Sequence, residues 1–192
     1  MRNPTRSFLS LSTVVLTGLI ACQGTGLQFA PVKLYLMDAP SDQIASAQVW
    51  ISRAYLVGGG ESDTDAAKPG FTITDTPQQY DLLQLQNGVT ALLGSDLIPV
   101  GDYAQLRLVV DSAKVTLVDG ATFADGSSSR TLKVPSGAQS GIKVVFAGPL
   151  HIDPAGAAIV VDFPVGENFV FQGPSASPLG VLFTPTLHGT VQ

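Results

Sequence analysis

The sequence predicts an all-β protein, most simply an antiparallel β-sandwich, with a β-barrel as the alternative. Three observations favour this class. Apolar residues make up 45% of the 192-residue chain and charged residues only 13%, which is sufficient for a packed core. Apolar and polar residues alternate in several short segments, as in strands with one buried face. The 20 Gly and 13 Pro divide these segments into short elements joined by turns.

Residues 1–21 are predicted to be an export signal. Arg2 and Arg6 precede an uncharged apolar run, Phe8–Ile20, which ends in small residues. The run is shorter than the roughly 20 apolar residues that cross a bilayer as a helix, and it also contains Ser and Thr. We therefore expect this segment to direct export rather than to remain as a transmembrane anchor.

The end of the signal resembles the bacterial lipobox. The residues are Leu19-Ile20-Ala21-Cys22, and in a lipobox the signal is cut before the Cys, whose thiol receives a diacylglyceryl group. Cys22 is the only Cys, which excludes an intramolecular disulfide or a Cys-rich metal site. We predict lipidation at Cys22, a short tether over 22–31 and one domain over 32–192. The alternative is an ordinary cleaved signal in which Cys22 is merely a small residue.

The lipid anchor predicts a place in the cell envelope. Two or more acyl chains hold a protein firmly to a membrane, so the membrane is an expected partner. By resemblance to Gram-negative lipoproteins, Gln23 after the Cys suggests the outer membrane; in another organism we expect the outer face of the cell membrane. Without residues 1–21 the chain has 8 basic and 15 acidic residues, a net charge of -7, which argues against nucleic acid as a partner.

The strands follow from alternation and from turn residues. Alternating side chains mark the first four, and Asp119-Gly120, Asp125-Gly126 and Asp153-Pro154-Ala155-Gly156 separate later ones. The predicted strands are Val32–Met37, Gln48–Ser52, Tyr103–Val110, Ala113–Leu117, Thr131–Val134, Ile142–Ala147, Ala157–Phe163, Asn168–Gln172 and Leu179–Thr184. The leucines of residues 80–93 fit a short helical segment better than a strand, and Val57–Gly70 is predicted to be a long surface loop.

Several segments resemble a bacterial lipoprotein family catalogued as domain of unknown function 4382. They are Leu36–Pro40, Tyr80–Gly88, Gly101–Leu108, Leu132–Lys143 and Val161–Phe163. The resemblance extends from about Val32 to Thr186. It implies an exported, usually lipidated β-sandwich similar to the transthyretin or prealbumin type, and it implies no established activity.

No catalytic residue is predicted. The two histidines, His151 and His188, lie at no spacing that pairs either with a nucleophile, and motifs for hydrolases or phosphate loops are absent from the sequence. We therefore expect a non-catalytic protein. An envelope hydrolase that uses His151 or His188 is the alternative.

No cofactor is expected, although one acidic segment allows a calcium site. Glu61, Asp63 and Asp65 alternate as calcium ligands do, but Ala66 stands where an EF-hand has Gly and Thr72 where it has a bidentate Glu. A solvated acidic loop is the simpler interpretation, and a calcium-stabilised adhesion domain is the alternative.

The densest polar block of the family-like segments predicts a ligand site. Ser136, Gln139, Ser140 and Lys143 can present hydroxyl, amide and ammonium groups from one connection, as sugar-binding loops do, although the same residues also suit a purely structural loop. Tyr35, Trp50, Tyr55 and Tyr103 alternate with the aliphatic rows and either stack on a sugar or pack in the core. The sequence thus predicts a binding or structural module for a glycan or an envelope protein.

Overall fold

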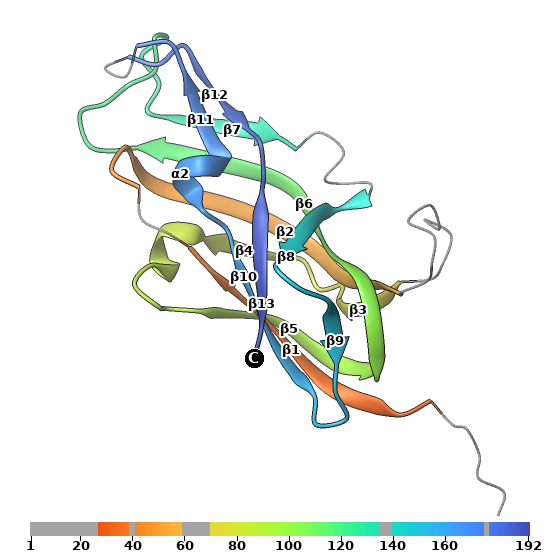
Figure 1. Cartoon of the computed structure of the whole chain (residues 1–192). Helices are drawn as coiled ribbons and strands as arrows, with labels where there is room; N and C mark the ends of the chain where they lie inside the picture. Colours follow the sequence, from red (N-terminus) through yellow and green to blue (C-terminus); the bar gives the residue numbers. More distant parts are fainter. Residues whose placement is uncertain (1–26, 39–40, 59–69, 135–139, 175–176) are drawn as a thin grey trace, which may run out of the picture.

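The computed structural model describes residues 27–38, 41–58, 70–134, 140–174 and 177–192. It confirms the all-β class (Figure 1). The strands are β1 (Phe29–Met37), β2 (Ile44–Gly58), β3 (Phe71–Thr74), β4 (Gln78–Asp81), β5 (Ala91–Pro99), β6 (Gly101–Leu117), β7 (Ser129–Lys133), β8 (Ile142–Phe146), β9 (Leu150–Ile152), β10 (Ala157–Asp162), β11 (Phe169–Gln172), β12 (Gly180–Phe183) and β13 (Leu187–Val191). The helical elements described are a 3-10 turn, η1 (Leu82–Leu85), and a short helix, α2 (Val165–Asn168).

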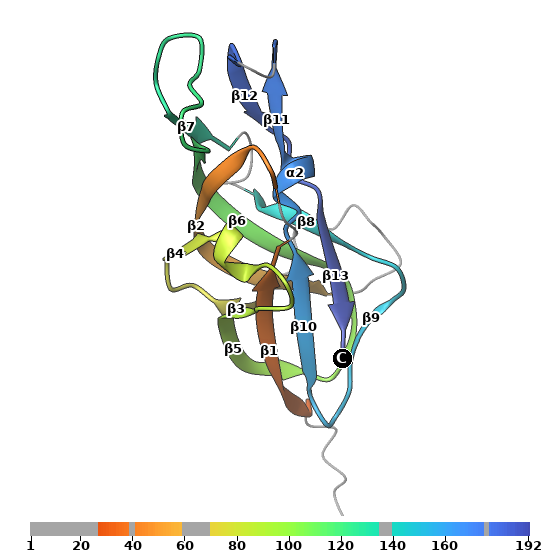
Figure 2. The same cartoon turned by 90° about the vertical axis from the view of Figure 1, so that its left-hand side faces the viewer.

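Most of the strands form one curled sheet. Its order is β3-β2-β6-β8-β13-β10-β1-β5, with β4 paired to β2 and with β7 and β9 paired to β6. Figure 2 shows β5, β1, β10 and β13 side by side, and Figure 1 shows the long ribbons of β2 and β6 running together across the molecule. The hairpin β11–β12 is a separate two-stranded sheet at one end.

The two edges of the curled sheet approach each other. A Cβ atom at Gly94 of β5 would lie 2.5 Å from the Cβ of Thr74 in β3, so only a residue without a side chain fits between these strands. The sheet therefore nearly closes on itself, and its two halves face each other across the core.

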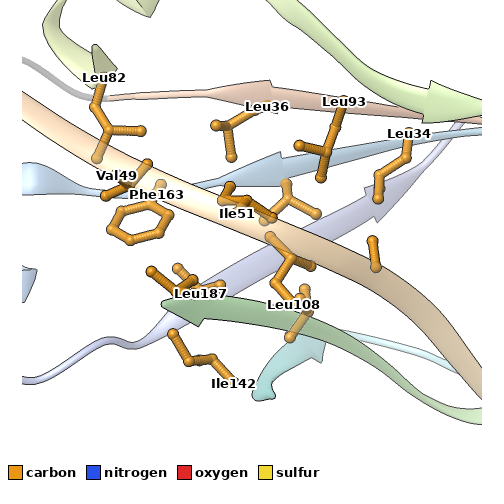
Figure 3. Close-up of a cluster of buried hydrophobic side chains, with 14 of the residues drawn as sticks. Leu34, Leu36, Val49, Ile51, Leu82, Leu93, Leu108, Ile142, Phe163 and Leu187 are labelled. Carbon is orange, nitrogen blue, oxygen red and sulfur yellow. The ribbon is translucent and has the colours of Figure 1, made fainter. Parts of the chain in front are cut away.

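The core lies between these halves. Strand residues alternate between buried and exposed positions, and the buried rows of both halves point inward. Figure 3 shows side chains that meet there, namely Leu34, Leu36, Val49, Ile51, Leu82, Leu93, Leu108, Ile142, Phe163 and Leu187. This burial is what the alternating pattern predicts.

Two strand pairs differ from the antiparallel arrangement that the sequence suggested. β1 pairs with β10 in parallel, and β13 pairs with β8 in parallel, whereas the other strand pairs are antiparallel. Parallel neighbours need a long connection, and between β1 and β10 this connection consists of β2 to β9.

Residues 101–117 form one strand rather than the two that were predicted. Leu106, Leu108 and Val110 point into the core, but the next buried residues are Ala113 and Val115, so the alternation slips by one position. The slip coincides with shifts in the register between β2 and β6. A bulge in a continuous strand therefore produced a pattern that resembles a turn.

The helical segment predicted near residues 80–93 is confined to η1. Asp81 caps its start, because its Oδ1 accepts a hydrogen bond from the backbone N–H of Leu83 at 3.3 Å. The chain reverses at Asn87 and Gly88, which both have positive φ. Leu92 and Leu93 already belong to β5.

Candidate functional site

Two cationic side chains and one aromatic side chain form a row across the outer surface of three adjacent strands. In the strand register, Tyr55 of β2 lies opposite Arg107 of β6, and Arg107 lies opposite Lys143 of β8. Side chains at paired positions lie on the same face of a sheet. Together with Trp50 and Arg53 on the same side of β2, these residues define what we call the basic face.

Tyr55 is fixed by three neighbours. The guanidinium carbon of Arg53 lies 4.4 Å from the centre of its ring, a cation–π contact. Its hydroxyl donates a hydrogen bond to the backbone oxygen of Ser140 at 2.7 Å. The backbone of Gly70 packs against the ring so closely that a Cβ atom there would lie 2.6 Å from Cδ2 of Tyr55. Tyr55 therefore positions Arg53 and the segment before β8.

Arg107 holds the same segment from the neighbouring strand. Its Nη1 donates to the Ser140 oxygen at 2.9 Å, and its Nε donates to Oε1 of Gln105 at 2.9 Å. Gly141 follows with φ of +71°, and a Cβ atom there would lie 3.1 Å from the Leu108 oxygen. The start of β8 is thus attached to the basic face at defined points.

Further cations extend this face. Trp50 lies opposite Ser112, which lies opposite Lys133 of β7, and Gln48 lies opposite Lys114. The surface of a domain with a net charge of -7 therefore gathers five of its eight basic residues on one side of β2, β6, β7 and β8, namely Arg53, Arg107, Lys114, Lys133 and Lys143.

These five cations make no ion pair within the described parts of the chain. There, ion pairs involve Arg130, with Asp125, and His151. The carboxylate of Asp111 lies on β6 and accepts a hydrogen bond from the hydroxyl of Ser52 at 3.0 Å. The basic face can therefore offer several charged donors to an anion.

The structure brings together part of the predicted ligand site. Ser140 and Lys143 lie at the basic face, while Ser136 and Gln139 fall outside the described residues. Of the four aromatic candidates, Trp50 and Tyr55 belong to this face. Tyr103 instead packs in the core, where its hydroxyl donates to the Pro99 oxygen at 2.6 Å and burial raises the pKa of its phenol. Tyr35 lies on β1, in the other half of the sheet.

Sequence reasoning missed Arg53 and Arg107. Each stands between uncharged neighbours in an alternating strand, where a solvated side chain is the ordinary interpretation. Their contacts depend on the register of β2, β6 and β8, which brings together residues 53, 107 and 140 from distant parts of the chain. No local signal in the sequence marks these two arginines as neighbours of residue 140.

His151 has carboxylate neighbours that its position in the sequence did not predict. Its Nδ1 lies 2.7 Å from Oδ1 of Asp102, and its Nε2 lies 3.5 Å from Oδ1 of Asp153. The hydrogen bond that the ring donates to Asp102 raises the pKa of the imidazole, which is exposed. His188 lies on β13 opposite Asp162. Within the described residues, neither imidazole has a hydrogen bond to a hydroxyl or thiol that could serve as a nucleophile.

The other predicted sites lie in segments that the structure does not describe. These are the lipidation site at Cys22 and the calcium candidates Glu61, Asp63 and Asp65. The described ranges contain no group of three or more His, Cys, Asp or Glu side chains arranged to hold a metal ion. Across these same ranges, no helix has the length and apolar character needed to cross a membrane.

A small pocket lies away from the basic face. Its volume is about 100 Å³, and it opens where the β11–β12 hairpin meets the end of β6. The lining is largely apolar and comprises Asp42, Gln43, Leu117, Val118, Ala121, Phe171 and Pro178. None of the predicted ligand residues contributes to it.

Three of the family-like segments meet at the end of β1. The Asp38 N–H donates to the Leu85 oxygen at 3.2 Å, and the Phe163 N–H donates to the Met37 oxygen at 2.9 Å. Oδ1 of Asp38, a residue only 3% exposed, accepts from the Val165 N–H at 2.9 Å. These segments therefore join β1, η1, β10 and α2 into a buried frame.

Comparison with known proteins identifies the family of the chain. A family model described as a domain of unknown function (DUF4382) matches residues 29–176. The chain belongs to the DUF4382 family. The matched part of this DUF4382 domain includes both the buried frame at Asp38 and the whole basic face. No curated protein and no solved structure matches the chain.

Proposed function

We propose that this DUF4382 protein is a lipoprotein of the cell envelope, anchored through Cys22, and that its domain is a non-catalytic module that binds an anionic glycan on the basic face. The lipobox-like residues Leu19–Cys22 support the anchor. The row formed by Tyr55, Arg107 and Lys143 supports the binding site, and it is the observation on which the proposal chiefly rests.

The chemistry of the face suits a polymer of sugars that carry carboxylates. Arg presents planar pairs of donors to a carboxylate, and Lys adds a mobile point charge. Sugar hydroxyls accept hydrogen bonds from the same groups, and Trp50, which is half-buried, offers an indole surface for the apolar face of a sugar ring. Because the rest of the domain is acidic, an anionic polymer is attracted to this face and repelled elsewhere.

Binding to polygalacturonate, with neutral dextran as the comparison polymer, tests the site. The full mature lipoprotein in detergent should bind polygalacturonate and lose affinity as salt is raised, because salt screens exposed charges. Lys143→Ala should weaken binding about tenfold, since one hydrogen bond to a charged group contributes roughly 1.5 to 3 kcal/mol.

A charge-matched control separates the site from net charge. Lys33→Ala removes one positive charge from the outer face of β1, outside the basic face, and should leave the affinity unchanged. Equal affinity in the parent protein, Lys143→Ala and Arg53→Ala would refute the site. Mass spectrometry tests the anchor separately: the N-terminal peptide should begin at Cys22 and carry acyl groups, and an unmodified Cys22 would refute lipidation.

A further inference from the structure

The chain enters the domain through an exposed apolar surface. Leu27 is 73% exposed, Phe29 50% and Leu97 62%. Phe29 and Pro31 alternate on the outer side of β1, and Leu97 of β5 lies opposite Pro31. These four residues, Leu27, Phe29, Pro31 and Leu97, form what we call the apolar edge. It lies at the end of the molecule where β1 begins in Figure 1.

The position of this edge is fixed relative to the rest of the domain. The backbone oxygen of Gln28 accepts a hydrogen bond from the N–H of Val100 at 2.8 Å, in the connection between β5 and β6. The turn before β10 lies against the same strand, because a Cβ atom at Gly156 would lie 2.4 Å from the Pro31 oxygen. Leu27 is therefore attached to a packed end of the sheet.

The covalent chain limits how far this end can lie from the anchor. Five residue steps separate Cys22 from Leu27, and a fully extended chain covers at most about 3.6 Å per residue, or roughly 18 Å in total. Acyl chains on Cys22 lie in the bilayer, so Leu27 cannot lie farther than this from the membrane surface. The limit rests on the lipid anchor proposed above.

We propose that the apolar edge docks on the bilayer that holds the anchor, with Phe29 and Leu97 entering the interfacial region. The transfer of exposed aromatic and aliphatic side chains from water to this region is favourable. Lys33 follows on the same outer side of β1, where its long side chain reaches lipid phosphates. The domain is thereby held in one orientation, with the β11–β12 hairpin pointing away from the membrane (Figure 1).

The charges around the edge define which lipids are needed. Lys33 supplies a positive charge beside the apolar edge. Asp96, next to Leu97 in β5, and Asp153, in the turn before β10, are both exposed and negatively charged. Their carboxylates oppose any attraction to anionic lipid. Docking should therefore depend on apolar contact and should occur on zwitterionic phosphatidylcholine.

Site-specific fluorescence on vesicles tests this orientation. The anchor consumes Cys22, so an introduced Cys is the one thiol of the lipoprotein free for labelling. We would label Leu97→Cys with an environment-sensitive dye in the full lipoprotein, reconstituted in phosphatidylcholine vesicles that contain spin-labelled lipid. The matched control is Leu182→Cys, a leucine 47% exposed on the β11–β12 hairpin. Quenching should be about twofold or more stronger at residue 97 than at residue 182.

A second variant checks that the dye itself does not cause insertion. Phe29→Ser, combined with the label at residue 97, should reduce the quenching because it removes the neighbouring apolar contact. No effect of Phe29→Ser would overturn the role of the edge.

The outcomes distinguish the docking from the anchor. Equal quenching at residues 97 and 182, or no quenching at residue 97 in acylated, vesicle-bound protein, overturns the docking and leaves the anchor intact. Protein that is neither acylated at Cys22 nor bound to vesicles refutes the anchor, and the docking falls with it.

Discussion

The aromatic cluster beneath the β11–β12 hairpin gives a prediction about stability. Phe183 is buried in β12, where its ring centre lies 5.0 Å from that of Phe169 and 5.9 Å from that of Phe163. Phe163 follows β10 and belongs to the main core. Phe183 is thus a principal contact between the separate hairpin and the large sheet.

Phe183→Ala should lower the free energy of unfolding by about 3 to 5 kcal/mol, the usual cost of removing a buried Phe side chain. Domains of this size lose roughly 2 to 4 °C of Tm for each kcal/mol, so the Tm should fall by about 6 to 20 °C. Total stabilities are only about 5 to 15 kcal/mol, so the loss is large. Urea unfolding can be followed by the fluorescence of Trp50, the single Trp, which lies on β2 outside the hairpin.

The adjacent residue of the same strand supplies the control. Leu182 pairs with Val170 on the outward side of the hairpin and is exposed. Leu182→Ala should therefore cost less than about 1 kcal/mol. If Phe183→Ala destabilises the protein no more than Leu182→Ala does, the hairpin is not packed on the core through these rings, and the reasoning is wrong.

Three further predictions concern single sites. Burial raises the pKa of Asp162, so the free energy of unfolding should fall as the pH rises from about 3.8 through the folded pKa. Asp162→Asn should remove this fall and raise the Tm at neutral pH. A difference in Tm between the variant and the parent that stays the same from pH 3 to pH 7 would contradict this prediction. Gly156→Ala should cost about 1 to 3 kcal/mol in urea unfolding, because Gly156 has φ of +97° and no room for a Cβ beside Pro31; a neutral effect would mean that this turn differs in solution. The hydrogen bond that His151 donates to Asp102 raises the pKa of His151, so its contribution to stability is present below pH 6.5 and is lost as the pH rises through the folded pKa. Asp102→Asn should remove this dependence, and a thermal-melt series near neutral pH that keeps the parent's slope would contradict the assignment.

The sequence predicted the strands that carry a clear alternation. Residues of β1 such as Val32 and Leu34 are buried every second position, and this pattern is visible without knowledge of any partner strand. The short strands β3, β4, β9 and β13 were missed, because three to five residues give too little periodicity. The longer β5 was missed because its exposed run Ser95–Leu97 breaks the alternation. β3, β4 and β9 pair with the long strands β2 and β6, and β13 lies between β8 and β10, so these neighbours set their conformation.

The parallel neighbours could not be predicted in the same way. Ile159, Val160 and Val161 of β10 are all buried, so this strand has little alternation and its direction relative to β1 leaves no local trace. The basic face shows the same limit. The polar block before β8 pointed to Ser140 and Lys143, but the contribution of Arg107 depends on strand register, which is a property of the folded sheet.

The place of β1 within the sheet has a consequence for the order in which the fold can be completed. β1 precedes the other described strands in the sequence, yet its neighbour β10 follows about 125 residues later, since Val32 pairs with Ala157. Until that partner arrives, one edge of an apolar strand has no native neighbour and is open to other chains. The sheet also depends on contacts between distant residues, which slow folding. The complete sheet can therefore form only after β10 and β13 have been synthesised, that is, after most of the domain.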